Sequence, residues 1–254
     1  MTGTLRVLGL GPGQADWITP EASRELAAAS DIVGYQAYVS RLTVRSDQNV
    51  HASDNGDELA RARHALELAA GGAQVAVVSG GDPGVFAMAA AVFEAIDHGP
   101  PGWRELDVAV LPGVTAMLAA AARLGAPLGA DFCAINLSDN LKPWSVIEQR
   151  LALAVQADFI IALYNPASKA RPEQVHKAFA VLRAAVSGDR VVAFAAAVGR
   201  KDESLHVTTL ANADPGRADM RTLILIGSSG TRLVERSSGT PFVYSSRRWS
   251  GAER

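Results

Sequence analysis

The stretch Gly80-Gly81-Asp82-Pro83-Gly84-Val85-Phe86 decides the fold, because it joins an apolar strand predicted at 74–79 to an apolar helix predicted at 84–97. Two similar turns follow predicted strands elsewhere: Gly9-Leu10-Gly11-Pro12-Gly13 near the start and Leu163-Tyr164-Asn165-Pro166 near the middle. In an open α/β sheet, loops at the carboxyl ends of strands present backbone amides and carbonyls where ligands bind. The three turns therefore predict one ligand cleft.

The composition indicates a folded globular protein without a nucleic-acid partner. The chain has 254 residues, 48% of them hydrophobic, and 24 basic residues nearly balance 26 acidic ones. Such a chain can bury a full core, and it lacks the clustered positive charge that phosphate backbones require. The longest apolar runs are too short to cross a bilayer, and no export signal precedes the first strand, so no membrane partner and a cytoplasmic location are expected.

Cysteine and histidine usage argues against a built-in metal site. Cys133 is the only cysteine, so neither an internal disulfide nor a thiolate cluster can form. The five histidines, at positions 51, 64, 98, 176 and 206, show no ligand spacing, and each is expected to be a surface residue. The sequence predicts no metal.

Hydrophobic periodicity in residues 1–113 predicts an α/β domain in which strands and helices alternate. Strands are expected at 5–10, 31–34, 74–79 and 106–111, and helices at 20–30, 36–46, 56–71 and 84–97. Thr19 is expected to cap the first helix, with Pro20 at its first position.

Residues 114–240 are predicted to form a second α/β domain. Helices are expected at 114–124, 143–156 and 171–186, and strands at 131–137, 158–163, 190–197, 204–209 and 221–227. Successive strands late in the chain favour antiparallel pairing, so this sheet is expected to be mixed. Residues 241–254 are interpreted as a polar tail, with disorder predicted around Arg247-Arg248-Trp249.

Two common nucleotide motifs are absent. A dinucleotide fingerprint needs glycine three residues after Gly11, where Gln14 stands, and the chain has no Gly-Lys pair for a phosphate-binding P-loop. What remains is a set of glycine and proline turns with one carboxylate, as expected for a cofactor held by backbone groups. A single glycine turn is more often only a turn. Asp82 is open to two interpretations that are compatible, a cap of the helix beginning at Pro83 and a ligand contact.

The motifs, in this order, resemble the S-adenosylmethionine-dependent tetrapyrrole methyltransferases of the corrin and sirohaem pathways. The resemblance covers nearly the whole chain and rests on the Gly-Pro-Gly turn, GGDPGVF, Leu111-Pro112-Gly113-Val114-Thr115-Ala116 and the Tyr-Asn-Pro turn. A closer similarity to the ring-contracting members that methylate carbon 17 in cobalamin synthesis rests on four segments: Asp16 to Ala22, Asp31 to Tyr35 with Tyr38, Ile135 to Asp139, and Ala162 to Lys169.

The resemblance implies the tetrapyrrole methylase fold, with two α/β domains, a cofactor cleft between them and a homodimeric assembly. It implies S-adenosylmethionine contacts at Pro12, Gly81, Asp82, Val85, Thr115, Ala116, Tyr164, Asn165, Ala197 and Gly199. Thr115 and Ala116 also fit the packed start of a helix. The implied substrate is a small-molecule tetrapyrrole fringed with carboxylates, for which Lys169, Arg171 and Arg200 are the candidate partners, although each also fits an ordinary surface position.

Methyl transfer to an electron-rich ring carbon needs alignment and exclusion of water rather than a covalent enzyme intermediate. In the ring contraction implied by the resemblance, a hydroxylated carbon 20 is extruded into an acetyl group, so a proton must leave oxygen and a general base or acid would help. Asp16, Ser138 and Asp139 are the candidates, and Asp16 equally fits a turn cap.

Three alternatives stay open at the level of sequence. They are methylation at another tetrapyrrole position, the anaerobic cobalt-containing version of the same step, and a binding protein that keeps the fold and holds cofactor without chemistry. The intact glycine turns argue against the last.

Overall fold

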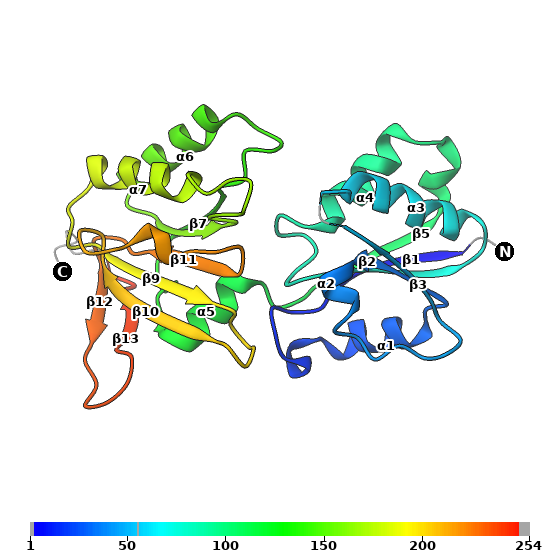
Figure 1. The fold of residues 1–254 in the computed structure, drawn as a ribbon, viewed down its shortest axis with the longest axis horizontal. Coiled ribbons are helices and arrows are strands. Elements are labelled where there is room, and N and C mark those ends of the chain that lie inside the picture. The colour runs from blue at the N-terminus through cyan, green and yellow to red at the C-terminus, as the bar shows by residue number, and fades with distance from the viewer. Residues whose placement is uncertain (1–2, 55, 249–254) are drawn as a thin grey trace. The chain divides into compact units, whose positions relative to one another are not determined.

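The computed structural model describes residues 3–54 and 56–248, and it divides into two compact units, Met1–Ala116 and Met117–Arg254. Each unit has its own sheet and its own hydrophobic core (Figure 1). No helix in the described part of the chain combines the length and hydrophobicity that a bilayer crossing requires.

The first unit is built on a five-stranded parallel sheet in the order β3-β2-β4-β1-β5. Its strands are β1 (Thr4–Gly9), β2 (Asp31–Tyr35), β3 (Asn49–Ser53), β4 (Gln74–Ser79) and β5 (Asp107–Leu111). Its helices are α1 (Pro20–Ala28), α2 (Gln36–Val39), α3 (Glu58–Ala70) and α4 (Met88–His98), with 3-10 turns η1 (Ala15–Trp17) and η2 (Pro101–Glu105). The predicted cap is confirmed, since Thr19 Oγ1 accepts a hydrogen bond from Ala22 N at 3.2 Å.

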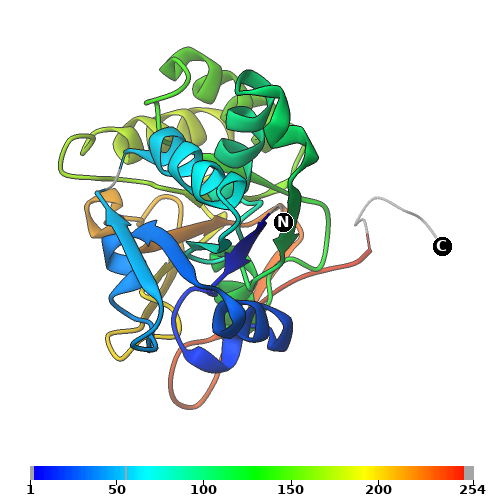
Figure 2. The same ribbon diagram turned by 90° about the vertical axis from the view of Figure 1, so that its right-hand side faces the viewer.

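Helices cover both faces of this sheet, as expected for parallel strands that are apolar on both sides. On one face Val7 and Val77 pack with Leu66 of α3 and Val92 of α4. On the other face Leu8 packs with α1. Figures 1 and 2 show α3 and α4 over one face and α1 under the other. Both faces of the sheet are therefore packed against helices, and the loops that form the site follow its carboxyl ends.

Three predictions for this unit are wrong in detail. Strand β3 was not expected, and α2 ends at Val39 rather than at 46. Helix α4 begins at Met88 rather than at 84, so the residues after Asp82 form a loop and Asp82 does not cap that helix.

The second unit has the mixed sheet that the sequence predicts, in the order β10-β9-β11-β8-β7. Only β7 and β8 pair in parallel, and the other neighbours are antiparallel. Its strands are β7 (Phe132–Asn136), β8 (Ile160–Tyr164), β9 (Val191–Ala196), β10 (Ser204–Thr209) and β11 (Thr222–Ile226). Its helices are α5 (Ala116–Leu124), α6 (Trp144–Gln156) and α7 (Gln174–Ala185), with the 3-10 turn η3 (Pro215–Arg217). Leu151 and Phe179 lie in the core between the sheet and helices α6 and α7.

A small third sheet corrects the prediction of a polar tail. It consists of β12 (Thr231–Val234), β13 (Phe242–Ser245) and β6 (Gly125–Ala126). The buried side chain of Val243 shows why 242–245 is structured, since its strand packs one face inward. Arg247 and Arg248 are exposed, and Trp249 lies outside the described residues.

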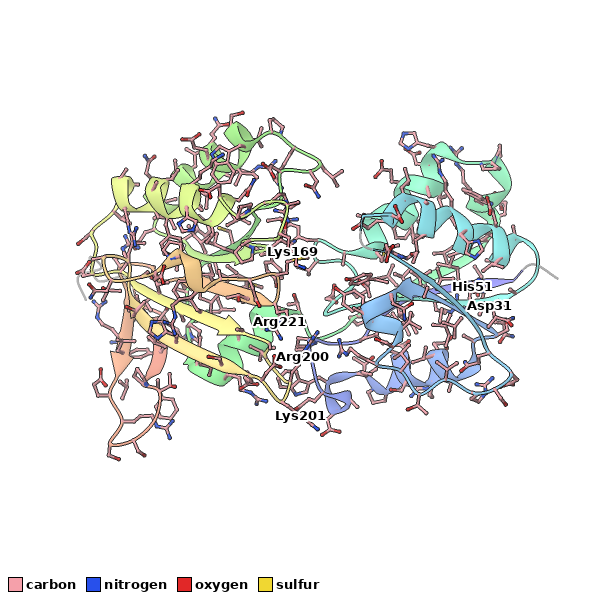
Figure 3. The ribbon with its side chains drawn as sticks, viewed as in Figure 1. Asp31, His51, Lys169, Arg200, Lys201 and Arg221 are labelled. Carbon is pink, nitrogen blue, oxygen red and sulfur yellow. The ribbon has the colours of Figure 1, made fainter. Side chains whose placement is uncertain are left out.

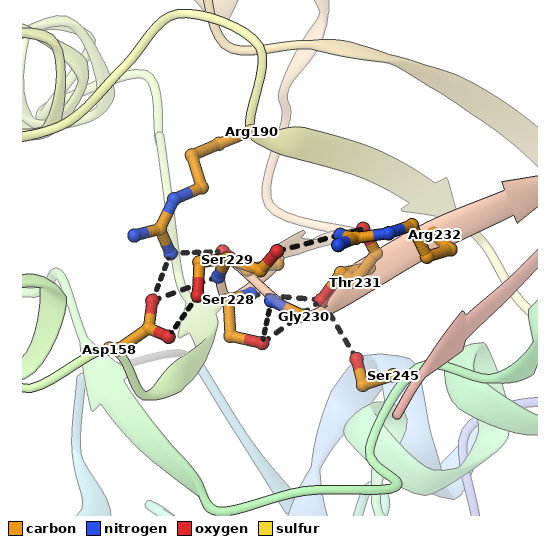
Figure 4. Close-up of polar contacts among 9 residues, drawn as sticks. Asp158, Arg190, Ser228, Ser229, Gly230, Thr231, Arg232 and Ser245 are labelled. Carbon is orange, nitrogen blue, oxygen red and sulfur yellow. Dashed lines mark hydrogen bonds and ion pairs between the residues drawn. The ribbon is translucent and has the colours of Figure 1, made fainter. Parts of the chain in front are cut away.

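A polar network fixes the amino end of β8 to the turn between β11 and β12 (Figure 4). The Asp158 carboxylate accepts hydrogen bonds from the Ser229 amide and hydroxyl and pairs with Arg190 at 2.6 Å. Arg190 and Arg232 line a cavity of about 330 Å³ beside this network. Because Asp158 precedes β8 and Asn165 follows it, the cavity lies at the opposite end of β8 from the predicted Tyr-Asn-Pro turn.

Candidate active site

In the first unit, the glycine turns after β1 and β4 are joined directly through their backbones. Gly11 N donates to Gly81 O at 3.1 Å, and Gly81 N donates to Gly11 O at 3.0 Å. Gly81 has φ +69°, a left-handed conformation that favours glycine. The two motifs that the sequence places 70 residues apart thus form one surface of backbone atoms.

The turn after β5 packs against the same atoms. A Cβ on Gly113 would lie 2.3 Å from Gly81 O, and a Cβ on Gly9 would lie 2.7 Å from Gly113 Cα. Only glycine permits this approach, because no side-chain carbon fits at such distances. The loops at the carboxyl ends of β4, β1 and β5 therefore contact one another through main-chain atoms, without side chains between them.

Asp82 ties the loops together. Its Oδ1 accepts from Gly84 N at 2.8 Å, and its Oδ2 accepts from Gly113 N at 2.9 Å. The first bond closes a turn within the GGDPGVF loop, and the second reaches the loop after β5. The half-buried carboxylate thus shapes this surface.

The other first-unit candidates lie on the same three loops. Val85 N donates to Asp82 O, Thr115 is buried, and Ala116 is the first residue of α5. Pro12 follows Gly11 in the turn after β1. Phe86, with φ +52°, is exposed at the end of the motif.

In the second unit, the loops after β7 and β8 are joined by Asn136. Its Oδ1 accepts from Ser138 N at 2.9 Å and from Asn165 Nδ2 at 3.1 Å. Asn165 has φ +50°, although the residue before a proline is normally extended. Next to it, the Tyr164 hydroxyl accepts from Met117 N, in the first turn of α5, at 3.0 Å.

The loop after β9 holds the last two cofactor candidates. Ala197 is buried and has φ +50°, and its N donates to Arg221 O. Gly199 N donates to Glu203 Oε2 at 2.7 Å, and Arg123 pairs with the same carboxylate at 3.0 Å. Glu203 thus holds this loop in shape.

Backbone strain gathers on the motif loops. Four non-glycine residues in the described part of the chain have positive φ, and Phe86, Asn165 and Ala197 belong to loops that the sequence singles out. Such conformations cost about 1–3 kcal/mol each and persist where the surroundings impose them, most often at functional sites.

The catalytic candidates fall into two places. Asp16 is exposed within η1 of the first unit. Ser138 and Asp139 are half-buried after β7 in the second unit. A hydrogen bond from Gln174 Nε2 at 2.9 Å lowers the pKa of the Asp139 carboxyl, which is therefore ionised at neutral pH.

A lysine that the sequence reasoning missed lies beside them. Lys142 Nζ donates to Ser138 O at 3.1 Å, and burial lowers the pKa of its ammonium group. An amine with a lowered pKa close to two catalytic candidates is suited to proton transfer.

The three candidate partners for substrate carboxylates differ in setting. Arg171 Nη1 and Gln174 Oε1 are both buried, and neither has a hydrogen-bond partner. Lys169 and Arg200 are exposed, and Figure 3 labels them with Lys201 and Arg221 of the same unit. Arg221 forms ion pairs with Asp202 and Asp219.

The histidine expectation is wrong for two residues, His51 and His206, which are both only partly exposed. His51 Nε2 lies 2.9 Å from Asp31 Oδ1 (Figure 3). Its Nδ1 lies 3.0 Å from His64 Nε2. Within 3–54 and 56–248, no three His, Cys, Asp or Glu residues form a group that could hold a metal ion.

Sequence reasoning missed Asn136, Lys142, Gln174 and Glu203 as parts of this arrangement. Asn136 lies inside a segment that resembles the family, but a polar residue at the end of a strand does not show which residue it bonds to. Gln174 reaches Asp139 and Glu203 reaches Arg123 from distant parts of the chain, which spacing does not reveal, and the local contact of Lys142 with the Ser138 carbonyl depends on the conformation of the loop.

Comparisons with known proteins identify the family and the fold of the chain. The family model described as tetrapyrrole (corrin/porphyrin) methylases matches residues 4–214. A precorrin-3B C(17)-methyltransferase from a Sinorhizobium species is 56% identical over the full length of both chains. A probable cobalt-factor III C(17)-methyltransferase from Salmonella typhimurium is 40% identical over 94% of this chain and 99% of its own.

Solved structures show the same fold. The crystal structure of the methyltransferase CobJ matches with a TM-score of 0.90 and 50% identity, covering 96% of this chain and all of that one. A uroporphyrin-III C-methyltransferase from Thermus thermophilus, in complex with S-adenosylhomocysteine, matches in fold with a TM-score of 0.64 at 19% identity, over 89% of this chain and 97% of its own. The resemblance stated from the motifs is confirmed, and the chain belongs to the family of tetrapyrrole (corrin/porphyrin) methylases.

Proposed function

We propose that this enzyme methylates precorrin-3B at carbon 17 with ring contraction to precorrin-4, in cobalamin biosynthesis, using S-adenosylmethionine as methyl donor. The observation that carries the proposal is the 56% identity, over both full lengths, to a precorrin-3B C(17)-methyltransferase. The strained and glycine-only backbone of the motif loops supports it, since these are the positions at which a family cofactor would be held.

The motif loops fit a cofactor bound mainly by main chain. At Gly9 and Gly113 the main chains of the loops lie so close together that a Cβ would collide with them, and Gly81 has a left-handed backbone. Asp82 fixes two of the loops through hydrogen bonds from main-chain amides. Bound there, S-adenosylmethionine supplies an electrophilic methyl group. The residues proposed to hold it are Pro12, Gly81, Asp82, Val85, Thr115 and Ala116 in the first unit, and Tyr164, Asn165, Ala197 and Gly199 in the second.

The residues proposed for methyl transfer act by orientation. Alignment of two reactants supplies up to roughly 7–11 kcal/mol in favourable cases, so a rigid frame is more valuable here than a reactive side chain. The hydrogen bonds of Asp82 and Asn136 provide such rigidity.

Ring contraction needs a proton to leave a hydroxyl oxygen, and Asp16, Ser138 and Asp139 remain the proposed participants. The lowered pKa of Asp139 makes its carboxylate a weaker base, which suits stabilising a positive charge better than accepting a proton. Lys142 joins the set, because the lowered pKa of its ammonium group brings the neutral amine closer to neutral pH.

Arg171 is the strongest of the three proposed substrate anchors. Its buried Nη1 lacks an acceptor, and a carboxylate that reaches it would form a charge-assisted hydrogen bond. Lys169 and Arg200, both exposed, complete the set. A homodimer, as the family resemblance implies, is part of the proposal.

A second candidate is the cobalt-containing step, favoured by the 40% identity to a probable cobalt-factor III C(17)-methyltransferase. Purified protein should be mixed with S-adenosylmethionine and metal-free precorrin-3B, and in parallel with the cobalt-containing counterpart. Mass spectrometry reports methylation, and NMR locates carbon 20. A contracted product from the metal-free substrate supports the proposal, turnover of the cobalt form alone supports the second candidate, and turnover of neither refutes both.

A further inference from the structure

The Asn136 side chain makes an unusual pair of contacts for a residue at the end of a strand. Its single Oδ1 atom accepts from the main chain of one loop, at Ser138 N, and from the side chain of the next loop, at Asn165 Nδ2. The two loops follow β7 and β8, which are parallel neighbours with Asn136 opposite Tyr164 in register. The main chain adds one more bond there, from Leu137 N to Tyr164 O at 2.9 Å.

Asn165 needs such a restraint. With φ +50° directly before Pro166, its backbone departs from the extended conformation that proline imposes on the preceding residue. A conformation of this kind persists only when other contacts determine it. Among the side-chain hydrogen bonds of the described residues, the one that involves Asn165 is donated by its Nδ2 to Asn136 Oδ1.

We infer that Asn136 is a positioning residue, which holds Asn165 in its left-handed conformation and the Ser138-Asp139 loop beside it. It acts through these two loops. One acceptor atom thus sets the geometry of a proposed cofactor loop and a proposed catalytic loop together. The inference rests on the proposed function for its effect on cofactor affinity, and on the hydrogen bonds alone for its effect on the loops.

Two substitutions separate the acceptor from the bulk of the side chain. Asn136→Leu keeps a similar size and removes the acceptor, leaving Ser138 N and Asn165 Nδ2 without it. Asn136→Asp keeps an oxygen in the same place. We expect Asn136→Leu to bind S-adenosylhomocysteine roughly 10-fold more weakly by calorimetry, as the loss of one or two hydrogen bonds implies, and Asn136→Asp to stay within about threefold of the wild type.

Thr231→Val serves as the control for general destabilisation. Thr231 is buried in the same unit and its Oγ1 accepts from Ser228 N at 2.9 Å, but it belongs to the network at the opposite end of β8 (Figure 4). It should lower the melting temperature without changing the affinity for S-adenosylhomocysteine.

Amide hydrogen exchange provides a readout that needs no ligand. The Ser138 amide should exchange at least tenfold faster in Asn136→Leu and at the wild-type rate in Asn136→Asp. Wild-type exchange and affinity in Asn136→Leu would overturn the inference, as would equal losses in both variants. If the wild type itself does not bind S-adenosylhomocysteine, the proposed function fails, and the exchange rates still decide whether Asn136 holds the loops.

Discussion

Replacing Asp82 with alanine tests whether the carboxylate organises the cofactor loops. The substitution removes two acceptors, Oδ1 for Gly84 N and Oδ2 for Gly113 N. Gly84 is exposed, so water replaces its lost partner, whereas Gly113 is half-buried and its amide is left without an acceptor. An unsatisfied buried donor costs about 1–3 kcal/mol, so we expect a loss of about 2 kcal/mol in the free energy of unfolding. For a chain of this size, that loss lowers the melting temperature by about 4–8 °C.

The substitution should also lower the affinity for the cofactor, because the loop after β5 is no longer fixed to the GGDPGVF loop. We expect Asp82→Ala to bind S-adenosylhomocysteine at least about tenfold more weakly in calorimetry. Asp82→Asn should be intermediate, since one oxygen remains for one of the two amides.

The chain contains a matched control. Asp214-Pro215-Gly216 repeats the sequence Asp82-Pro83-Gly84, and Asp214 Oδ1 accepts from Gly216 N at 2.9 Å in the same kind of turn. Asp214 is exposed, and its hydrogen bond with Gly216 N stays within its own turn. Asp214→Ala should therefore leave cofactor affinity unchanged. Equal affinities of Asp82→Ala and the wild type would refute the reasoning.

Four further substitutions test other contacts. Arg171→Ala should raise KM for the tetrapyrrole roughly 10- to 150-fold, as loss of a charge-assisted hydrogen bond implies, with S-adenosylhomocysteine affinity unchanged; a wild-type KM would remove Arg171 from the anchors. Tyr164→Phe should lower the free energy of unfolding by about 1 kcal/mol in urea, because Met117 N loses its acceptor, and an unchanged midpoint would contradict that. Asp16→Ala should preserve cofactor binding and impair ring contraction, and a variant with wild-type turnover would exclude Asp16. Burial raises the pKa of Asp31, but hydrogen bonds from His51, Ser30 and Asn49 outweigh this effect and lower the pKa. The ionised carboxylate therefore stabilises the fold above the unfolded-state pKa, and this stabilisation disappears as the pH falls through the lower folded-state pKa. Asp31→Asn should lose less stability than the wild type below about pH 4 in urea unfolding, and parallel curves for the two proteins would argue against the Asp31–His51 pair.

The strands and turns that carry the motifs were predictable because their signals are local. An apolar run followed by glycine and proline specifies a strand and a turn without reference to the rest of the chain. Strand β3 gives no such signal, because Asn49 and Val50 are exposed and the strand exists through its pairing with Asp31–Tyr35. The hairpin of β12 and β13 was missed for a similar reason, since Val243 is buried while the neighbouring Phe242 and Tyr244 are exposed, so the strand exists through its pairing.

The candidate site shows the same division. Gly81 and Asp82 could be singled out from the motif, but the helix expected after them begins only at Met88, because Asp82 uses its carboxylate to close a loop instead. Asn136 could not be assigned a role, because its importance comes from a neighbour 29 positions away along the chain.

For protein engineering, the contact of Gly113 with the Gly81 carbonyl separates positions that accept change from positions that do not. A Cβ at Gly113 or Gly9 would force main-chain atoms to shift, and the left-handed backbone of Gly81 strains any other residue, so most library variants at these three positions are disfavoured. A search for enzymes that accept altered macrocycles should keep these three codons fixed. It should diversify exposed positions of the second unit such as Lys169 and Arg200, where a new side chain meets solvent rather than backbone.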